Sequence, residues 1–169
     1  MRFIGEAEEA RSEIYAREGG AMSEVSFYDI LIEEIMNCNP PLIEKSASIY
    51  AVAKKVGMKR RHVWVVEGKD SRKLVGVITE KDLLDVISPL PFRSYTIGVI
   101  SPRCLHHTEL EKAEDIMAGP VIKCHPKTTI EEALRLMVNH RIRRLAVTEN
   151  DEIIGELSLT NVIHAYFSI

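Results

Sequence analysis

Gly76-Val77-Ile78-Thr79-Glu80-Lys81-Asp82 is the stretch that decides how this chain folds. It ends a run of β-branched residues and begins a run with helical spacing, so it predicts a strand that turns directly into a helix. The same pattern returns later in the chain as Gly155-Glu156-Leu157-Ser158-Leu159-Thr160-Asn161, with a glycine, a hydroxyl residue and an Asp or Asn in the same relative places. Such self-similarity indicates an internal duplication.

The duplication extends upstream of both glycines. Glu34-Ile35-Met36 reappears as Asp115-Ile116-Met117, and Arg61-His62-Val63-Trp64-Val65 reappears as Arg143-Arg144-Leu145-Ala146-Val147. Because few gaps are needed to align the two halves, we expect them to form the same elements in the same order.

Each half is predicted to run strand, helix, strand, strand, helix, on the basis of apolar spacing and capping residues. A short helix running into Met36 precedes the first half. The first half is expected to place strands at 42–43, 63–66 and 74–78, a helix from Ile49 to Val56 capped by Ser46 or Ser48, and a helix beginning at Thr79. The second is expected to place strands at 121–122, 145–147 and 153–157, a helix at 130–138 capped by Thr128 or Thr129, with Val138 in its buried stripe, and a helix at 162–167.

Together these motifs resemble the CBS domain, the module named after cystathionine β-synthase, and two copies in tandem resemble a CBS pair, or Bateman module. The resemblance covers roughly residues 28 to 168. It implies an α+β fold in which two βαββα repeats pack about a pseudo-two-fold axis and form two equivalent clefts. Apolar residues at helical spacing between charged ones add an amphipathic helix at residues 2–18. We therefore expect an N-terminal helix or extension at 1–24, a first repeat at 25–88, a connector at 89–111 and a second repeat at 112–169.

Composition favours a cytoplasmic protein. Hydrophobic residues make up 46% of the 169 residues, which is enough for a buried core. No apolar run approaches the roughly 20 residues that span a bilayer, and the acidic stretch from Glu6 to Glu18 does not resemble a secretory signal. The net charge of −3 argues against a surface that binds duplex DNA by bulk electrostatics.

The cysteine and histidine spacing predicts neither a disulfide framework nor a metal site. The chain has 3 cysteines and no Cys-x-x-Cys pair. Cys104, His106 and His107 lie close together but lack a fourth ligand nearby. We expect no metal and no required cofactor.

The repeated helix start is the candidate binding site. Thr79 and Asp82 have the spacing of a capping box, which needs no ligand. Capping does not explain Gly76, where the missing side chain would let another group approach. The resemblance to CBS pairs implies that Gly76, Thr79 and Asp82 bind a nucleotide. Asp82 would accept hydrogen bonds from the ribose hydroxyls, and Thr79 would bond the phosphate or the sugar edge.

The second copy departs from this pattern, because Ser158 replaces the threonine and Asn161 replaces the acid. Asparagine can donate and accept, but it loses the charge-assisted pairing with a diol, a difference on the order of 1–2 kcal/mol. We therefore expect the second site to be weaker, differently selective or empty.

Basic pairs stand before the second strand of each repeat, at Arg61-His62 and Arg143-Arg144. The resemblance implies that they reach phosphates, a task that suits the planar guanidinium fork. A solvated basic face is the alternative. Nucleic acid is a further alternative ligand, but the few aromatic residues and the absence of a visible stacking ladder argue against it.

No nucleophile, base and acid stand at catalytic spacing, so we expect no enzyme. The resemblance implies a regulatory module that senses AMP, ADP or ATP in the cleft between the repeats and transmits binding to a partner. S-adenosylmethionine is an alternative ligand, and a homodimer is expected by analogy. The competing function is a protein-interaction scaffold whose contact surface is the helix at 2–18 together with Trp64.

Overall fold

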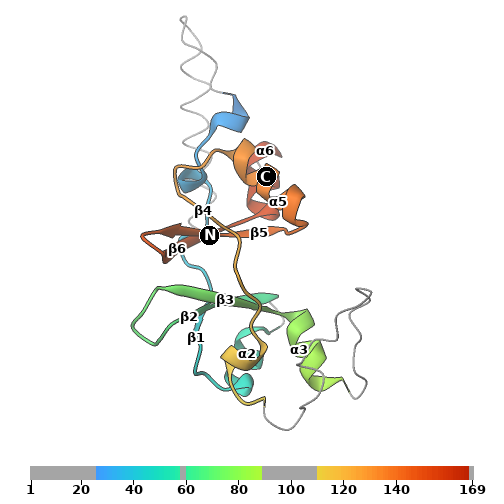
Figure 1. The fold of residues 1–169 in the computed structure, drawn as a ribbon. Helices are drawn as coiled ribbons and strands as arrows, with labels where there is room; N and C mark the ends of the chain where they lie inside the picture. Colours follow the sequence, from blue (N-terminus) through green and yellow to red (C-terminus); the bar gives the residue numbers. More distant parts are fainter. Residues whose placement is uncertain (1–25, 58–59, 89–109, 168–169) are drawn as a thin grey trace, which may run out of the picture. The chain divides into compact units, whose positions relative to one another are not determined.

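The computed structural model describes residues 26–57, 60–88 and 110–167 (Figure 1). The fold is α+β, as predicted, and divides into two compact units. Unit 1 comprises Met1–Asn39, Ile122–Glu149 and Ile154–Ile169, whereas unit 2 comprises Pro40–Val121 and Asn150–Ile153. We describe each unit by itself.

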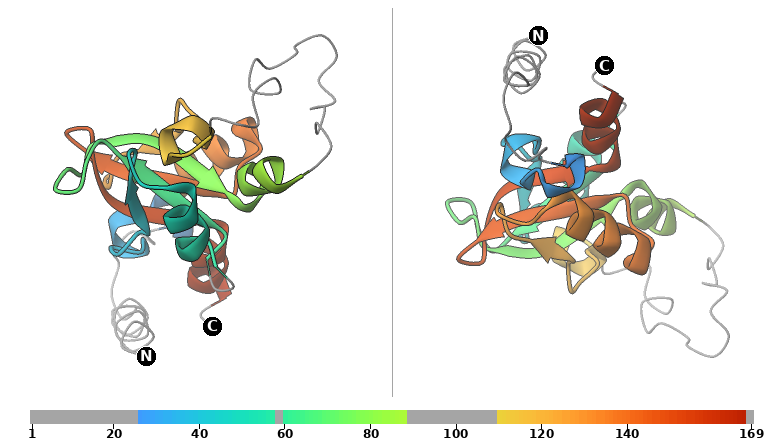
Figure 2. Two further views of the ribbon diagram at one scale, coloured as in Figure 1. Left: turned by 90° about the horizontal axis from the view of Figure 1, so that it is seen from below. Right: turned by 90° about the horizontal axis from the view of Figure 1, so that it is seen from above.

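Unit 2 is a three-stranded sheet with helices, and its strands lie in the order β1-β2-β3. The strand β1 is parallel to β2, which is antiparallel to β3. The side chain of Ser48 caps α2 by accepting the Ala51 N–H at 3.3 Å. Thr79 ends β3 and is the N-cap of α3, so the strand runs directly into the helix (Figures 1 and 2). The elements are β1 (Leu42–Glu44), α2 (Ile49–Lys55), β2 (His62–Val66), β3 (Leu74–Thr79), α3 (Glu80–Ile87) and α4 (Ala113–Ile116).

Unit 1 contains a second three-stranded sheet, in the order β4-β5-β6, with β4 parallel to β5. Thr129 caps α5 by accepting the Glu132 N–H at 3.3 Å. Asn150 and Asp151, which follow Glu149 and are assigned to unit 2, have φ values of 51° and 64°, the left-handed backbone that a tight hairpin turn requires. The elements are the 3-10 turns η1 (Phe27–Asp29) and η2 (Ile32–Glu34), followed by β4 (Lys123–Cys124), α5 (Ile130–His140), β5 (Arg144–Glu149), β6 (Glu152–Ser158) and α6 (Leu159–Phe167).

The two sequence repeats exchange their opening segments between the cores. Ile32, from the start of the first repeat, packs in the core of unit 1 with Ile130 and Leu157. Conversely, Ala113 and Ile116, from the start of the second repeat, pack in the core of unit 2. Backbone hydrogen bonds support both placements: the Ile32 N–H donates to the Thr128 carbonyl at 2.9 Å, and the Ala113 N–H donates to the Ala47 carbonyl at 2.8 Å. The compact units are therefore not continuous stretches of chain.

Three local predictions were wrong. The helix expected before Met36 is instead the two short turns η1 and η2. The strand expected at 121–122 lies instead at Lys123–Cys124. Parallel pairing of Lys123 with Ala146 sets its position, just as pairing of Leu42 with Trp64 sets the position of β1. Val138 is 74% exposed, since it lies about 100° around the helix from the buried Met137.

The strands predicted at 63–66, 74–78, 145–147 and 153–157, the helix that follows Thr79 and the capping by Ser48 and Thr129 are confirmed. The amphipathic segment at 2–18 and the connector as far as residue 109 lie outside the described residues. Within the part of the chain that the structure describes, every helix is too short or too polar to cross a bilayer.

Candidate functional site

Each repeated glycine faces a methionine of the repeated Ile-Met pair. A Cβ atom on Gly76 would lie 2.6 Å from Met117 Sδ, and a Cβ on Gly155 would lie 2.8 Å from Met36 Sδ and 3.1 Å from the Asn37 carbonyl oxygen. The close approach expected at these glycines therefore occurs, and within the described residues a methionine makes it. Sequence reasoning missed this partnership, although both halves of it were visible as repeated motifs. A contact of Gly76 with a ligand stays a prediction.

The start of α3 brings Thr79 and Asp82 together as the predicted capping box. One carboxylate oxygen of Asp82, Oδ2, accepts hydrogen bonds from the Thr79 N–H and from the Thr79 hydroxyl, both at 2.7 Å. The other oxygen, Oδ1, accepts no hydrogen bond from the described residues. The half-buried Asp82 side chain thus caps α3 with one carboxylate oxygen and leaves the other as a charged acceptor.

Arg61 and His62 lie beside this helix start. His62 pairs with Thr79 across β2 and β3, and the Glu80 N–H donates to the Arg61 carbonyl at 3.2 Å. The Arg61 side chain is 79% exposed, with Nε 4.0 Å from Glu80 Oε1. His62 is 5% exposed and packs edge-on against Trp64, with ring centroids 5.3 Å apart. The structure therefore gathers the predicted site residues of unit 2, with Arg61 as the exposed cation.

Trp64 is 3% exposed. A residue buried to this extent offers no surface to a partner, so the expectation that Trp64 forms part of a contact surface is wrong. The sequence could not show this, because a tryptophan in a strand suits a core and an interface equally well.

The start of α6 repeats the backbone arrangement with different polar groups. The Ser158 N–H donates to Asn161 Oδ1 at 3.0 Å, and the Ser158 hydroxyl donates to the same oxygen. In return, the Asn161 N–H donates to Ser158 Oγ at 3.2 Å. Because a backbone N–H can only donate, the amide oxygen of Asn161 must face Ser158, which turns the amide NH₂ away. That NH₂ group makes no hydrogen bond to another described residue.

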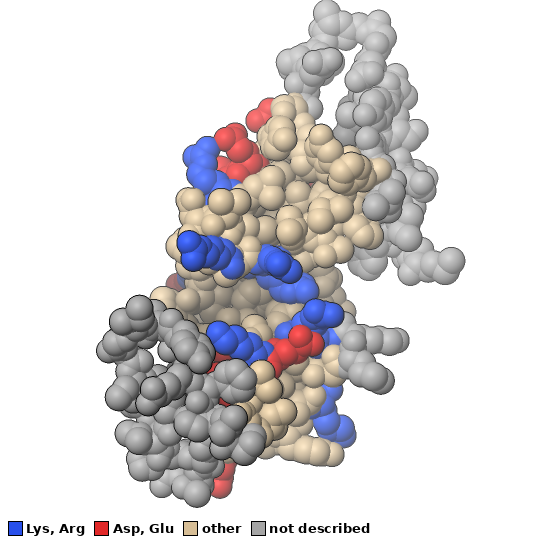
Figure 3. Space-filling view, turned by 90° about the vertical axis from the view of Figure 1, so that its right-hand side faces the viewer, with Lys and Arg blue, Asp and Glu red and all other residues tan. Residues whose placement is uncertain are grey.

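Arg143 and Arg144 stand next to the α6 start as Arg61 and His62 stand next to α3. The Leu159 N–H donates to the Arg143 carbonyl at 2.9 Å. Arg143 is exposed and Arg144 is half-buried, and neither forms an ion pair within the described ranges. Lys and Arg side chains form much of the charged surface on the face shown in Figure 3.

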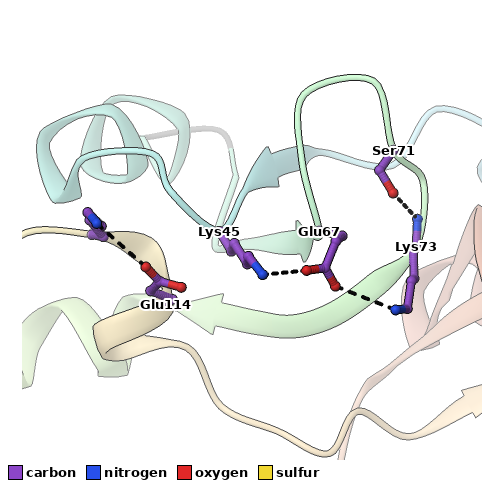
Figure 4. Close-up of polar contacts among 6 residues, drawn as sticks. Lys45, Glu67, Ser71, Lys73 and Glu114 are labelled. Atoms are coloured by element: carbon purple, nitrogen blue, oxygen red, sulfur yellow. Dashed lines mark hydrogen bonds and ion pairs between the residues drawn. The ribbon is translucent and has the colours of Figure 1, made fainter.

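A separate charge network lies in unit 2 and ties β1 to the β2–β3 hairpin (Figure 4). Lys45, which follows β1, bonds Glu67, which follows β2, and Lys73 Nζ lies 3.6 Å from the other Glu67 oxygen. The hydrogen bond and charge attraction between Lys45 and Glu67 raise the pKa of Lys45 and lower the pKa of Glu67. This network contains none of the predicted site residues.

Among the described residues, no group of His, Cys, Asp and Glu side chains is placed to hold a metal ion. Cys104, His106 and His107 lie outside the described ranges. Cys124 is buried, which raises the pKa of its thiol to about 12, whereas Cys38 is exposed.

Comparison with known proteins identifies the repeats. The family model of the CBS domain matches residues 32–89 and 113–168. The protein MJ0450 of Methanocaldococcus jannaschii is 26% identical over 125 residues, which are 73% of this chain and 60% of that protein. This chain thus spans less than two thirds of that relative.

Two solved structures share the fold. The crystal structure of CBSX2 in complex with AMP has a TM-score of 0.66 and 23% identity, and covers 82% of this chain and 96% of that one. The CBS domain pair of MJ0100, in complex with 5′-methylthioadenosine and S-adenosyl-L-methionine, has a TM-score of 0.61 and 19% identity, and covers 81% and 99%.

Proposed function

Because the chain belongs to the CBS domain family, we propose that it is a regulatory module that binds an adenosine nucleotide at the start of α3. Two structures of the same fold contain adenosine compounds, namely AMP in CBSX2, and 5′-methylthioadenosine with S-adenosyl-L-methionine in MJ0100. These ligands share an adenosine with a ribose diol. The proposed role here is binding and regulation rather than catalysis.

The observation that carries the proposal is the pairing of a charged acceptor with a cation at one helix start. Asp82 Oδ1 is available to accept a hydrogen bond from a ribose hydroxyl, since capping occupies Oδ2 alone. Arg61 lies at the same helix start and is exposed, so its guanidinium can bind a phosphate. The N-terminus of α3 adds N–H donors and partial positive charge.

We favour AMP, ADP or ATP over S-adenosylmethionine, because Arg61 would repel a sulfonium and attract a phosphate. Binding would regulate a protein partner, in a cytoplasmic homodimer, by shifting the population of two conformations. A ligand can do this only if its affinity for the two conformations differs.

A scaffold is the second candidate, and exposed aromatic side chains in unit 1 favour it. Tyr28, Tyr166 and Phe167 are 48%, 52% and 64% exposed. Phe27 contacts both tyrosines edge-on, with centroids at 5.7 and 5.0 Å. Together with the predicted helix at 2–18, they could contact another protein.

A thermal-shift panel separates the two candidates. AMP, ADP, ATP and S-adenosylmethionine are compared, since a ligand at 100 times its Kd adds about 2.7 kcal/mol to the free energy of unfolding. Asp82→Ala should abolish the shift. Asp85→Ala, which removes an exposed acid from the same helix, should leave it unchanged and is the matched control. Absence of any shift at millimolar ligand would favour the scaffold.

A further inference from the structure

Four aromatic rings form a chain of contacts on the surface of unit 1. Phe27, in η1, contacts Tyr28 and also Tyr166 of α6 edge-on, with ring centroids 5.7 and 5.0 Å apart. Tyr166 in turn contacts Phe167, with centroids 5.0 Å apart. Three of these rings are exposed, by 48% for Tyr28, 52% for Tyr166 and 64% for Phe167. We call these four residues the aromatic patch. Exposed apolar side chains that gather in this way mark a surface that contacts another segment or molecule.

The N-terminal segment, residues 1–25, lies outside the described residues and ends next to the aromatic patch. Ser26 alone separates it from Phe27. Residues 19–25, which begin with Gly19-Gly20, join the predicted helix at 2–18 to Ser26. A connection of this length spans up to roughly 25 Å, and a helix over 2–18 would be about 25 Å long. The predicted helix can therefore turn back and lie along the patch.

The apolar residues of the predicted helix would form one continuous face. At about 3.6 residues per turn they fall within an arc of about 140°. Arg11 also falls inside this arc, whereas Arg2 falls on the opposite, charged side. A guanidinium stacks on the faces of aromatic rings, so an arginine within an apolar face suits a surface made of such rings. The apolar residues are Phe3, Ile4, Ala7, Ala10, Ile14 and Tyr15.

We propose that residues 2–18 form a helix that docks on the aromatic patch of the same chain, with Arg11 against its rings. The short connection favours this occupant over a second copy, because a short flexible linker gives an effective concentration on the order of millimolar. The docking is independent of adenosine binding, since the patch belongs to unit 1 and contains no residue of the α3 start. Another protein could reach these rings only by displacing the helix.

The test is an NMR measurement of contacts between methyl groups and aromatic rings in the full chain. We expect nuclear Overhauser effects from the Ile14 methyl groups to the rings of Tyr166 and Phe167. An equimolar mixture of isotope-labelled and unlabelled chains separates contacts within one chain from contacts between chains. Effects within one chain support the proposal. Effects only between chains would show that a second copy supplies the helix, and no effects at all would show that the helix does not dock there. Either of these results overturns the proposal.

Matched substitutions on the two sides of the predicted helix test which face docks. Ala7→Glu places a charge within the apolar arc and should lower the docking equilibrium constant by about tenfold or more. Ala16→Glu makes the same change on the charged side and should leave this constant unchanged. Arg11→Ala should lower it by about threefold, whereas Arg2→Ala should not. Protection of the amides in 2–18 against hydrogen exchange measures the constant. Equal effects of Ala7→Glu and Ala16→Glu would contradict docking through the apolar face.

Discussion

The two units repeat one arrangement of strands, glycine, methionine and helix start, yet only unit 2 keeps an acid at the end of that arrangement. Gly76 with Met117 and Gly155 with Met36 preserve the packing, whereas the caps differ, because a carboxylate accepts the Thr79 N–H and an amide oxygen accepts the Ser158 N–H. The comparison indicates that the packing of a duplicated fold constrains both copies equally, while its surface chemistry can diverge through single residues. Substitutions at equivalent positions test each level of this comparison in turn.

The largest effect is expected in the cores, where the two units should behave alike. Ile78 and Leu157 occupy equivalent places and are both 0% exposed. Ile78→Ala and Leu157→Ala should each lower the free energy of unfolding by about 2–5 kcal/mol, since each leaves a cavity. Urea denaturation measures both. Ile87→Ala and Val138→Ala, at 76% and 74% exposure, are the controls and should change stability little. A large loss of unfolding free energy in only one of the two core variants would contradict the equivalence of the two cores.

The glycine–methionine contacts should show a smaller effect that the two copies share. Gly76→Ala and Gly155→Ala should each cost about 1–3 kcal/mol, because the new methyl group overlaps a methionine. Adding Met117→Ala at Gly76, or Met36→Ala at Gly155, should recover only part of the loss. The reason is that one atom stays close to the new Cβ in each unit: the Met117 Cβ at 3.0 Å, which alanine keeps, and the Asn37 carbonyl oxygen at 3.1 Å. Denaturation of the four single and two double variants gives both coupling energies. No recovery in either unit would contradict the steric account.

Removing the cap should destabilise the protein more at α6 than at α3, whereas we expect loss of adenosine binding from the change at α3. Asn161→Ala removes the acceptor of the Ser158 N–H, and Ser158 is only 8% exposed, so the loss should be about 1–3 kcal/mol. Asp82→Ala frees the Thr79 N–H, and Thr79 is only half-buried, so the loss should be nearer 0.5–1 kcal/mol. Thermal denaturation without ligand measures both losses. If Asp82→Ala is the more destabilising change, capping is the main role of this acid.

The smallest effect is expected from the Lys45–Glu67 contact. Its hydrogen bond lowers the pKa of Glu67 from the usual 4.5, so the contact stabilises the fold above that pH. The contribution is lost as the pH falls through the lowered pKa, because the folded state then takes up the proton. The raised pKa of Lys45 predicts a second loss at alkaline pH, above the usual 10.5.

Glu67→Gln should therefore be less stable than the wild type at neutral pH and converge with it in acid. Urea denaturation across the acid range measures the difference. Asp85→Asn removes one negative charge from an exposed position of α3 and controls for net charge. Parallel pH curves for Glu67→Gln and the wild type would show that the contact contributes nothing.

Much of the fold was predictable because local signals and the repeat agree. The strand-to-helix turn after Gly76 and the capping by Ser48 and Thr129 depend on short-range chemistry and are confirmed. The exchange of the opening segments was not predictable, since Ile32 and Ala113 satisfy the same apolar pattern in either core. The position of β4 was missed because strand pairing, rather than apolar content, places Lys123 and Cys124.

The candidate site was predictable in its residues but not in its chemistry. The repeat placed Arg61 beside Thr79 and Arg143 beside Ser158, and backbone contacts bring these neighbours together. The sequence could not show that His62 is buried. Nor could it show which atoms of Asp82 and Asn161 accept the capping hydrogen bonds. Those details depend on side-chain orientation at the turn, which spacing alone does not determine.

The most direct test is the number of adenosine molecules that each chain binds, measured by equilibrium dialysis with labelled adenosine. The wild type should bind one and Asp82→Asn none. Unchanged binding by Asp82→Asn would contradict the central claim that a single acid at the start of α3 captures the ribose.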